Sequence, residues 1–154
     1  MRPNMLMVLA LMLVSSLASA QHCRKADIDK SSGYCTVPDP ALTPGEMDAS
    51  MACSSLGHLR HVSDSEKDSI LVAYGYSADT DKSTGEFDHW YPEWIGGTDG
   101  PKNIWFEPHA GKFGSYAKDK VEKMLRQKVC VDHTMSVGEA KKALQGWTKL
   151  VHAQ

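Results

Sequence analysis

Residues 86–106, which read EFDHWYPEWIGGTDGPKNIWF, decide the fold of this chain. The first part alternates in polarity, is rich in aromatic residues and ends at a proline, so we expect a strand over Glu86 to Tyr91. The glycine-rich run Gly96 to Pro101 has the composition of a turn. Asn103 to Phe106 can form the returning strand. The segment therefore predicts two strands joined by a glycine-rich turn.

Helical patterns flank these strands on both sides. Ser63 and Glu66 form a capping-box pattern, which predicts a helix over Asp64 to Tyr74 that ends at Gly75. After the strands, KDKVEKMLRQKV (118–129) carries apolar residues at helical spacing and a basic exterior. A last helix is expected to begin at Ser136, at a second capping-box pattern. It buries Ala140, Ala143, Leu144 and Trp147. The fold class predicted from these elements is α+β.

The first twenty residues are typical of a secretory signal peptide. Arg2 precedes the apolar run MLMVLALMLV (5–14), and the small residues Ala18 to Ala20 follow. We expect cleavage after Ala20, because the apolar run is too short to span a bilayer. The alternative is a buried N-terminal helix. No second long apolar run follows, so the sequence predicts a secreted or periplasmic protein with no membrane association after cleavage.

Length and composition fit one globular domain. The chain has 154 residues, of which 42% are hydrophobic and 23% charged, and its formal net charge is −2. These values exclude a disordered chain and a highly basic nucleic-acid tail. Prolines and glycines punctuate residues 21–52, so we expect an irregular arm there and the folded domain over residues 53–154.

Four cysteines lie in the part expected to be exported. An even number in an oxidising compartment favours disulfides, although four cysteines allow three connectivities. We expect Cys23 to pair with Cys35, closing a short loop, and Cys53 to pair with Cys130, closing a long one. A zinc site is the alternative, but the chain contains no CxxC pair.

The central motifs resemble the HNH-type endonucleases, which have the ββα-metal fold. The resemblance rests on Asp88-His89-x-x-Pro92, Gly96-Gly97 and Asn103-Ile104-Trp105 in this order. A secreted or phage-encoded bacterial subgroup is similar over more of the chain. The further matches are Pro38 to Gly45, Tyr74-Gly75, Lys118 to Glu122, Val129-Cys130 and Glu139 to Trp147. The resemblance implies a small ββα-metal centre with flanking helices, stapled by disulfides.

The resemblance also implies roles for individual residues. A free imidazole has a pKa of roughly 6.5, close enough to neutrality to accept a proton from water, which suits His89 as the general base. Asp88 would bind a divalent ion, Mg²⁺ or Mn²⁺, through oxygen. Asn103 would hold the glycine loop and orient His89; its alternative is an ordinary turn asparagine.

The second metal ligand departs from the family pattern. The subgroup commonly places an asparagine just before the Lys-Asp pair, where this chain has Gly114-Ser115-Tyr116. His109 is the nearest replacement, and Glu107, Asp119 and Glu122 are poorer options. Successive side chains of an ideal strand face opposite sides, so Asp88 and His89 reach one ion only if the strand end twists. The alternative for both residues is a solvated strand edge.

A basic segment follows the strands. Residues 112–128 are rich in lysine and arginine, and we expect Lys112 and Lys118 to contact substrate phosphates. A charged helix face is, however, most often simply solvated.

These observations lead to one main functional expectation and two alternatives. The main expectation is a secreted, metal-dependent, non-specific endonuclease of DNA, with RNA as an open second substrate. The first alternative is a non-catalytic exported binding or effector protein on a degenerate HNH-like scaffold. The second is a small disulfide-bonded protein with a structural role. The sequence does not identify an immunity or inhibitor protein as a partner.

Overall fold

The computed structural model describes residues 23–30, 32–54 and 62–152, so the expected signal peptide lies outside the described residues. Within them, short 3₁₀ turns connect three α-helices and two strands. The order is α1 (Asp64–Ala73), β1 (Gly85–His89), β2 (Ile104–Pro108), α2 (Ser115–Arg126) and α3 (Val137–Gln145). One π-helical turn (Gln127–Val131) continues α2. The α+β class expected from the sequence is confirmed.

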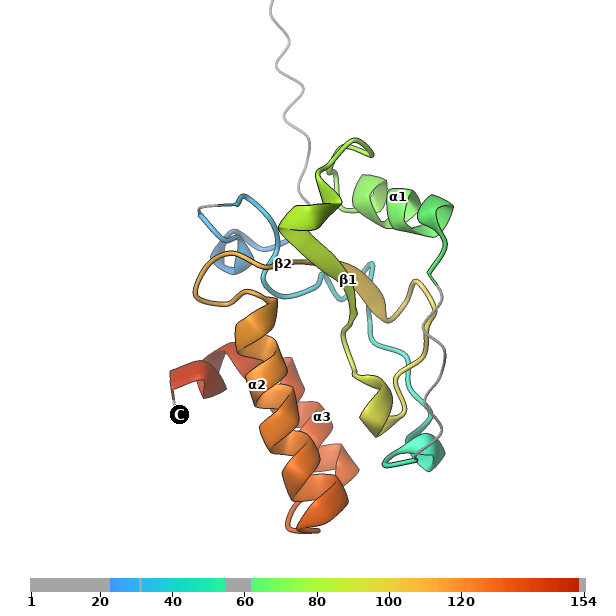
Figure 1. The fold of residues 1–154 in the computed structure, drawn as a ribbon, viewed down its shortest axis with the longest axis vertical. Helices are drawn as coiled ribbons and strands as arrows, with labels where there is room; N and C mark the ends of the chain where they lie inside the picture. Colours follow the sequence, from blue (N-terminus) through green and yellow to red (C-terminus); the bar gives the residue numbers. More distant parts are fainter. Residues whose placement is uncertain (1–22, 31, 55–61, 153–154) are drawn as a thin grey trace, which may run out of the picture.

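The two strands form an antiparallel hairpin. Phe87 lies opposite Phe106, and Asp88 lies opposite Trp105. Figure 1 shows α1 on one side of the hairpin and α2 and α3 on the other. Strand β1 ends at His89, earlier than expected. The backbone N–H and carbonyl of Tyr91 bind the Asn103 side chain and not the backbone of β2.

The helices begin where the sequence predicts them to begin, except for α2. The side chains of Ser63 and Ser136 cap α1 and α3, and each capping box is complete. Helix α2 begins at Ser115, three residues before the expected start, and has no side-chain cap. The earlier start adds Ser115 to the helix, and both Ser115 and Lys118 lie on its buried face.

Two apolar clusters hold these elements together. One lies between the hairpin loop (residues 90–103) and the C-terminal helices α2 and α3. The other lies between α1, β2 and the arm. The buried members of the first cluster are Trp90, Tyr91, Ile95, Val121, Leu125, Leu144 and Trp147. Those of the second are Cys35, Ile70, Tyr74, Ile104 and Trp105. Trp147 follows α3 in a 3₁₀ turn and is fully buried, as expected.

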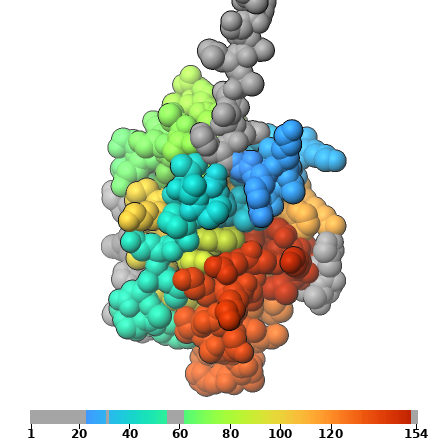
Figure 2. All heavy atoms as spheres, turned by 180° about the vertical axis from the view of Figure 1, so that it is seen from behind, coloured from blue at the N-terminus to red at the C-terminus, as the bar shows by residue number. Residues whose placement is uncertain are grey.

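Backbone pairing and the Cys53–Cys130 bridge directly after the arm fix it against the domain, whereas the Cys23–Cys35 bridge lies within the arm. The expected bridges Cys23–Cys35 and Cys53–Cys130 are both confirmed. Residues 45–53 pair with the hairpin loop, and one contact is the bridge between Met47 and Gly97. Figure 2 shows the arm, in cyan, lying over the face between α1 and the C-terminal helices. The arm is therefore irregular but fixed, and it supports the hairpin loop.

Among the residues that the structure describes, no helix combines the length and the apolarity needed to cross a membrane.

Candidate functional site

The candidate site consists of two polar clusters at the hairpin, one reached by His89 and the other by Asp88. These neighbouring side chains leave β1 in different directions, as strand alternation predicts. His89 is directed to the hairpin loop, where it contacts Asp99, and Asp88 is directed to α2, where it contacts Lys118. The expectation that Asp88 and His89 flank one metal ion therefore does not match the geometry of these side chains.

The first cluster, the histidine centre, consists of His89, Glu93 and Asp99. His89 Nε2 lies 2.7 Å from Asp99 Oδ1, and the His89 side chain is buried. One ligand atom from each of the three residues lies within 4.8 Å of the others. Glu93 Oε1 is buried and has no hydrogen-bond partner in the described part of the chain. A buried carboxylate oxygen without a partner is costly, and a bound cation would satisfy it.

A small cavity adjoins the histidine centre. It has a volume of about 220 Å³, and its lining includes Asp99, Gly97 and Asp48. The side chain of Asp99 is 33% exposed, so this group connects the buried imidazole to solvent. The cavity supplies room for water beside the centre.

Asn103 holds the loop that carries the histidine centre. It is fully buried, and its Oδ1 accepts a hydrogen bond from the backbone N–H of Tyr91 at 2.9 Å. Its Nδ2 donates to the carbonyl oxygens of Tyr91 and Thr98, both at 2.9 Å. One amide therefore fixes the chain on both sides of the Gly96-Gly97 turn. The asparagine therefore holds the glycine loop, as expected, and among the described residues its side chain makes no hydrogen bond to the His89 side chain.

Two glycines allow this loop to pack closely. Gly96 has a φ of 91°, and a Cβ there would lie 1.8 Å from the carbonyl oxygen of Asp48. A Cβ at Gly97 would lie 1.7 Å from the carbonyl oxygen of Tyr91. Side chains at these positions would push the loop away from the arm and from the strand end. The glycines thus bring Asp99 back toward His89.

The second cluster, the lysine centre, consists of Asp88, Glu107, Lys118 and Glu122. The ammonium nitrogen of Lys118 lies 2.6 Å from Asp88 Oδ2 and 3.0 Å from the carbonyl oxygen of His89. It also donates to Glu122 Oε1 and lies 3.6 Å from Glu107 Oε2. The side chains of Lys118 and Glu107 are both 0% exposed. Lys118 is therefore not on the basic exterior as expected, and from this position it cannot contact a substrate phosphate.

Burial shifts the ionisation of the lysine centre. It raises the pKa of Glu107 well above its ordinary value, and the nearby Lys118 offsets only part of this effect. It also raises the pKa of Glu122 to about 7, again against the opposing effect of Lys118. Burial alone would lower the pKa of Lys118, but Glu107, Glu122 and Asp88 raise it well above the usual range. The three carboxyl groups therefore favour the charged form of the lysine, and burial favours the protonated form of Glu107.

A Glu122→Gln substitution is expected to flatten the pH dependence of folding. The pKa of Glu122 is about 7 in the folded protein and 4.5 as the ordinary value, so between these pH values the folded state binds the extra proton. The contribution of Glu122 to the free energy of unfolding is therefore greatest below the lower pKa and decreases as pH rises through the higher one. The total loss is about 3 kcal/mol. Urea unfolding of both proteins at about pH 5 and about pH 8 measures the difference. Equal pH dependence in the two proteins would contradict this role.

The other expected site residues lie apart from both centres. His109 Nδ1 lies 2.8 Å from Ser115 Oγ, and its ring stacks on Tyr116. His109 belongs to neither group of converging ligand atoms found among the described residues. Lys112 is exposed, with its ammonium nitrogen 5.4 Å from the centre of the Phe113 ring.

Four carboxyl groups of these centres have roles that the sequence did not predict. Glu93 lies between the expected strand and the glycine-rich turn and was assigned no role, and Asp99 was expected only as part of that turn. Glu107 and Glu122 were expected only as poorer metal ligands, whereas they surround an ammonium group. The available signal was helical spacing, because Lys118, Glu122 and Leu125 fall on one stripe of α2.

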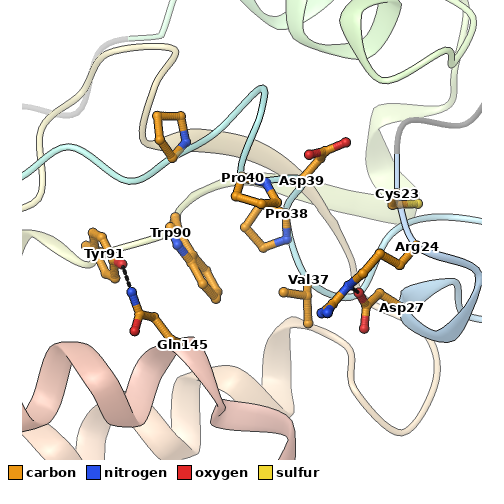
Figure 3. Close-up of a pocket in the computed structure, with 11 residues that line it drawn as sticks. Cys23, Arg24, Asp27, Val37, Pro38, Asp39, Pro40, Trp90, Tyr91 and Gln145 are labelled. Carbon is orange, nitrogen blue, oxygen red and sulfur yellow. Dashed lines mark hydrogen bonds and ion pairs between the residues drawn. The ribbon is translucent and has the colours of Figure 1, made fainter.

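A larger cavity is lined by Trp90, Tyr91 and residues of the arm. Its volume is about 350 Å³, and Figure 3 shows Trp90 and Tyr91 across from Val37, Pro38 and other residues of the arm. The Nε2 atom of Gln145, the last residue of α3, donates to the Tyr91 hydroxyl at 2.9 Å. This cavity is mostly apolar and includes no member of the two centres. Its lining also includes the charged residues Arg24, Asp27 and Asp39.

No family model matches the chain, and no curated protein or solved structure matches it either.

Proposed function

We propose that this protein is an exported, metal-dependent endonuclease that hydrolyses phosphodiester bonds in DNA, with RNA as a second substrate. The observation that carries the proposal is the convergence of His89, Glu93 and Asp99 at the end of β1. The order β1, glycine loop, β2 and α2 is the one that the resemblance to HNH-type endonucleases implies, so we assign these elements to a ββα-metal centre. Two disulfides are consistent with export to an oxidising compartment.

The histidine centre has a donor set that fits a divalent ion. One imidazole nitrogen and two carboxylates would hold it, and Glu93 contributes a buried oxygen without a partner among the described residues. Carboxylates suit Mg²⁺ and Mn²⁺, whereas imidazole suits transition metals, so Mn²⁺ fits this mixed set better than Mg²⁺. The expected pair of ligands, Asp88 and His109, does not fit. Asp88 is bound to Lys118, and His109 is bound to Ser115.

The residues of the centre divide the work as follows. A divalent ion, when bound, supplies Lewis-acid polarisation of the phosphodiester. His89 and Glu93 provide buried ligand atoms, and Asp99 provides the carboxylate that also faces the adjacent cavity. Asn103 holds the loop so that Asp99 and His89 remain within 2.7 Å of each other. In this proposal His89 is a ligand in place of the general base that the sequence suggested.

Plasmid cleavage with defined metals tests the proposal. The disulfide-bonded protein should nick supercoiled plasmid in Mn²⁺, more weakly in Mg²⁺, and not in EDTA. Glu93→Gln should raise the Mn²⁺ concentration needed for half-maximal cleavage by about tenfold or more, because it removes a ligand charge. Glu86→Gln makes the same substitution on β1 outside the histidine centre and should leave that concentration unchanged. Cleavage that resists EDTA, or an equal response in both variants, would contradict the proposal.

The second candidate is a non-catalytic exported binding protein on the same scaffold. The apolar cavity of about 350 Å³ beside Trp90 favours it, because concave apolar sites of this size commonly hold small ligands. Absence of plasmid cleavage by the folded protein with every divalent ion tested would favour this candidate over the endonuclease.

A further inference from the structure

The carboxyl groups of the lysine centre resemble the ligands of a cation site, and the cation that they surround is a side chain of the protein itself. We propose that the Lys118 ammonium group is the permanent cation of this centre and occupies the place that a divalent metal would otherwise take beside Asp88. The native lysine centre therefore binds no metal, whether or not the histidine centre is catalytic. This conclusion differs from the metal role that the sequence suggested for Asp88.

The contacts of the ammonium group support this assignment. A lysine has three N–H donors, and here Asp88, Glu122 and the His89 carbonyl accept from Lys118. A fourth oxygen, from Glu107, lies 3.6 Å away. Carboxylate and carbonyl oxygens are the ligands that hard divalent ions prefer, so the same oxygen atoms would suit Mg²⁺ or Ca²⁺. The ammonium group donates to three of these oxygens in place of an ion, whereas the carboxylate oxygens of Glu107 are buried without a hydrogen-bond partner among the described residues.

Neighbouring carboxylates make the centre attractive to cations in general. Ligand oxygens of Glu86, Asp88 and Glu107 lie within 4.8 Å of one another at the hairpin. An isolated group of this kind would repel itself strongly in a buried setting. One fixed positive charge relieves the repulsion, and a second cation entering beside it would be repelled by that charge.

The position of Lys118 on α2 explains why it reaches the centre. Val121 and Leu125 are buried on the same helix and pack in the cluster beneath the hairpin loop. Lys118 precedes Val121 by three residues, so its side chain leaves the helix on this buried face. Glu122 lies four residues after Lys118 and joins the same contact. The helix therefore delivers both the cation and one of its ligands.

The proposal predicts that removal of the lysine side chain creates a metal site. Terbium luminescence excited through tryptophan measures this, because Trp105 lies opposite Asp88 in the hairpin. Lys118→Ala should gain a Tb³⁺ site on the order of tenfold tighter than any Asp88-dependent binding in the native protein. Adding Asp88→Asn to Lys118→Ala should abolish the gain. Asp88→Asn alone, with Lys118 present, should leave Tb³⁺ luminescence unchanged, because any ion that the native protein binds occupies the histidine centre.

Two results would overturn the proposal. One is a folded Lys118→Ala protein, verified by circular dichroism, that gains no Asp88-dependent site. The other is Tb³⁺ binding by the native protein that is lost when Asp88→Asn is the only substitution. The second comparison needs no change at Lys118, so it decides the question even if Lys118→Ala does not fold. Because neither readout measures cleavage, an inactive protein would refute the endonuclease without affecting this result.

Discussion

A His89→Ala protein is expected to cleave plasmid DNA at least about a hundredfold more slowly than the native protein and to bind Mn²⁺ at least about tenfold more weakly. The substitution removes the only imidazole of the histidine centre and leaves Glu93 and Asp99 without a nitrogen donor between them. Turnover from plasmid assays and Mn²⁺ affinity from isothermal titration calorimetry measure the two effects. Raising the Mn²⁺ concentration should restore part of the lost rate.

The joint loss of turnover and affinity separates the two roles considered for His89. If His89 were a general base, its removal would lower turnover alone, and Mn²⁺ affinity would equal that of the native protein. His109→Ala is the matched control, because this histidine lies outside the histidine centre against Ser115 and Tyr116. It should change neither quantity. Full turnover in folded His89→Ala would remove His89 from the mechanism.

A Lys118→Met protein is expected to lose about 3–5 kcal/mol of unfolding free energy at neutral pH. Methionine fills much of the same space but leaves Asp88 and Glu122 without their buried partner. The loss should shrink at about pH 5, because Glu122, with its pKa of about 7, is then protonated and carries no charge to be compensated. Urea unfolding at the two pH values gives both numbers.

The control for this prediction lies on the same helix. Lys123 is exposed, so Lys123→Met changes the same residue type without touching the lysine centre. Its effect should stay within about 0.5 kcal/mol. If Lys118→Met and Lys123→Met had equal effects, the Lys118 contacts would not contribute to stability in the way described.

Local signals in the sequence were sufficient for much of the fold. The two capping boxes marked the starts of α1 and α3, because each depends only on residues three apart. Alternating residues around a glycine-rich turn marked the hairpin. The loop lengths favoured the pairing of the four cysteines that the structure contains. The capping boxes and the turn depend on neighbours in the chain, which sequence patterns record directly, whereas the Cys53–Cys130 bridge joins residues 77 apart.

The position of Lys118 was wrong for a different reason. Charged residues are rarely buried, so the sequence placed this lysine on the exposed face of α2. Its spacing to Val121 and Leu125 nevertheless puts it on the buried stripe. Burial is possible only because Asp88 arrives from β1 and Glu107 from β2 to meet it. Such contacts between distant segments are not visible in the pattern of one helix.

The histidine centre depended on tertiary structure to the same degree. Asp99 reaches His89 because Gly96 turns the loop with a positive φ and Asn103 binds it at Thr98. The arm supports the same loop through the backbone of Asp48. The sequence identified His89 and Asn103, but the path of the chain between them determined which carboxylate meets the imidazole.

Anomalous diffraction from crystals soaked in Mn²⁺ locates a bound ion without reference to activity. We expect one protein-bound peak between the His89 imidazole and the carboxylates of Glu93 and Asp99, whose ligand atoms already lie within 4.8 Å of one another. We expect no peak beside Asp88, where Lys118 is bound. A peak at Asp88 or His109 with the histidine centre empty would contradict the assignment of the metal to the histidine centre.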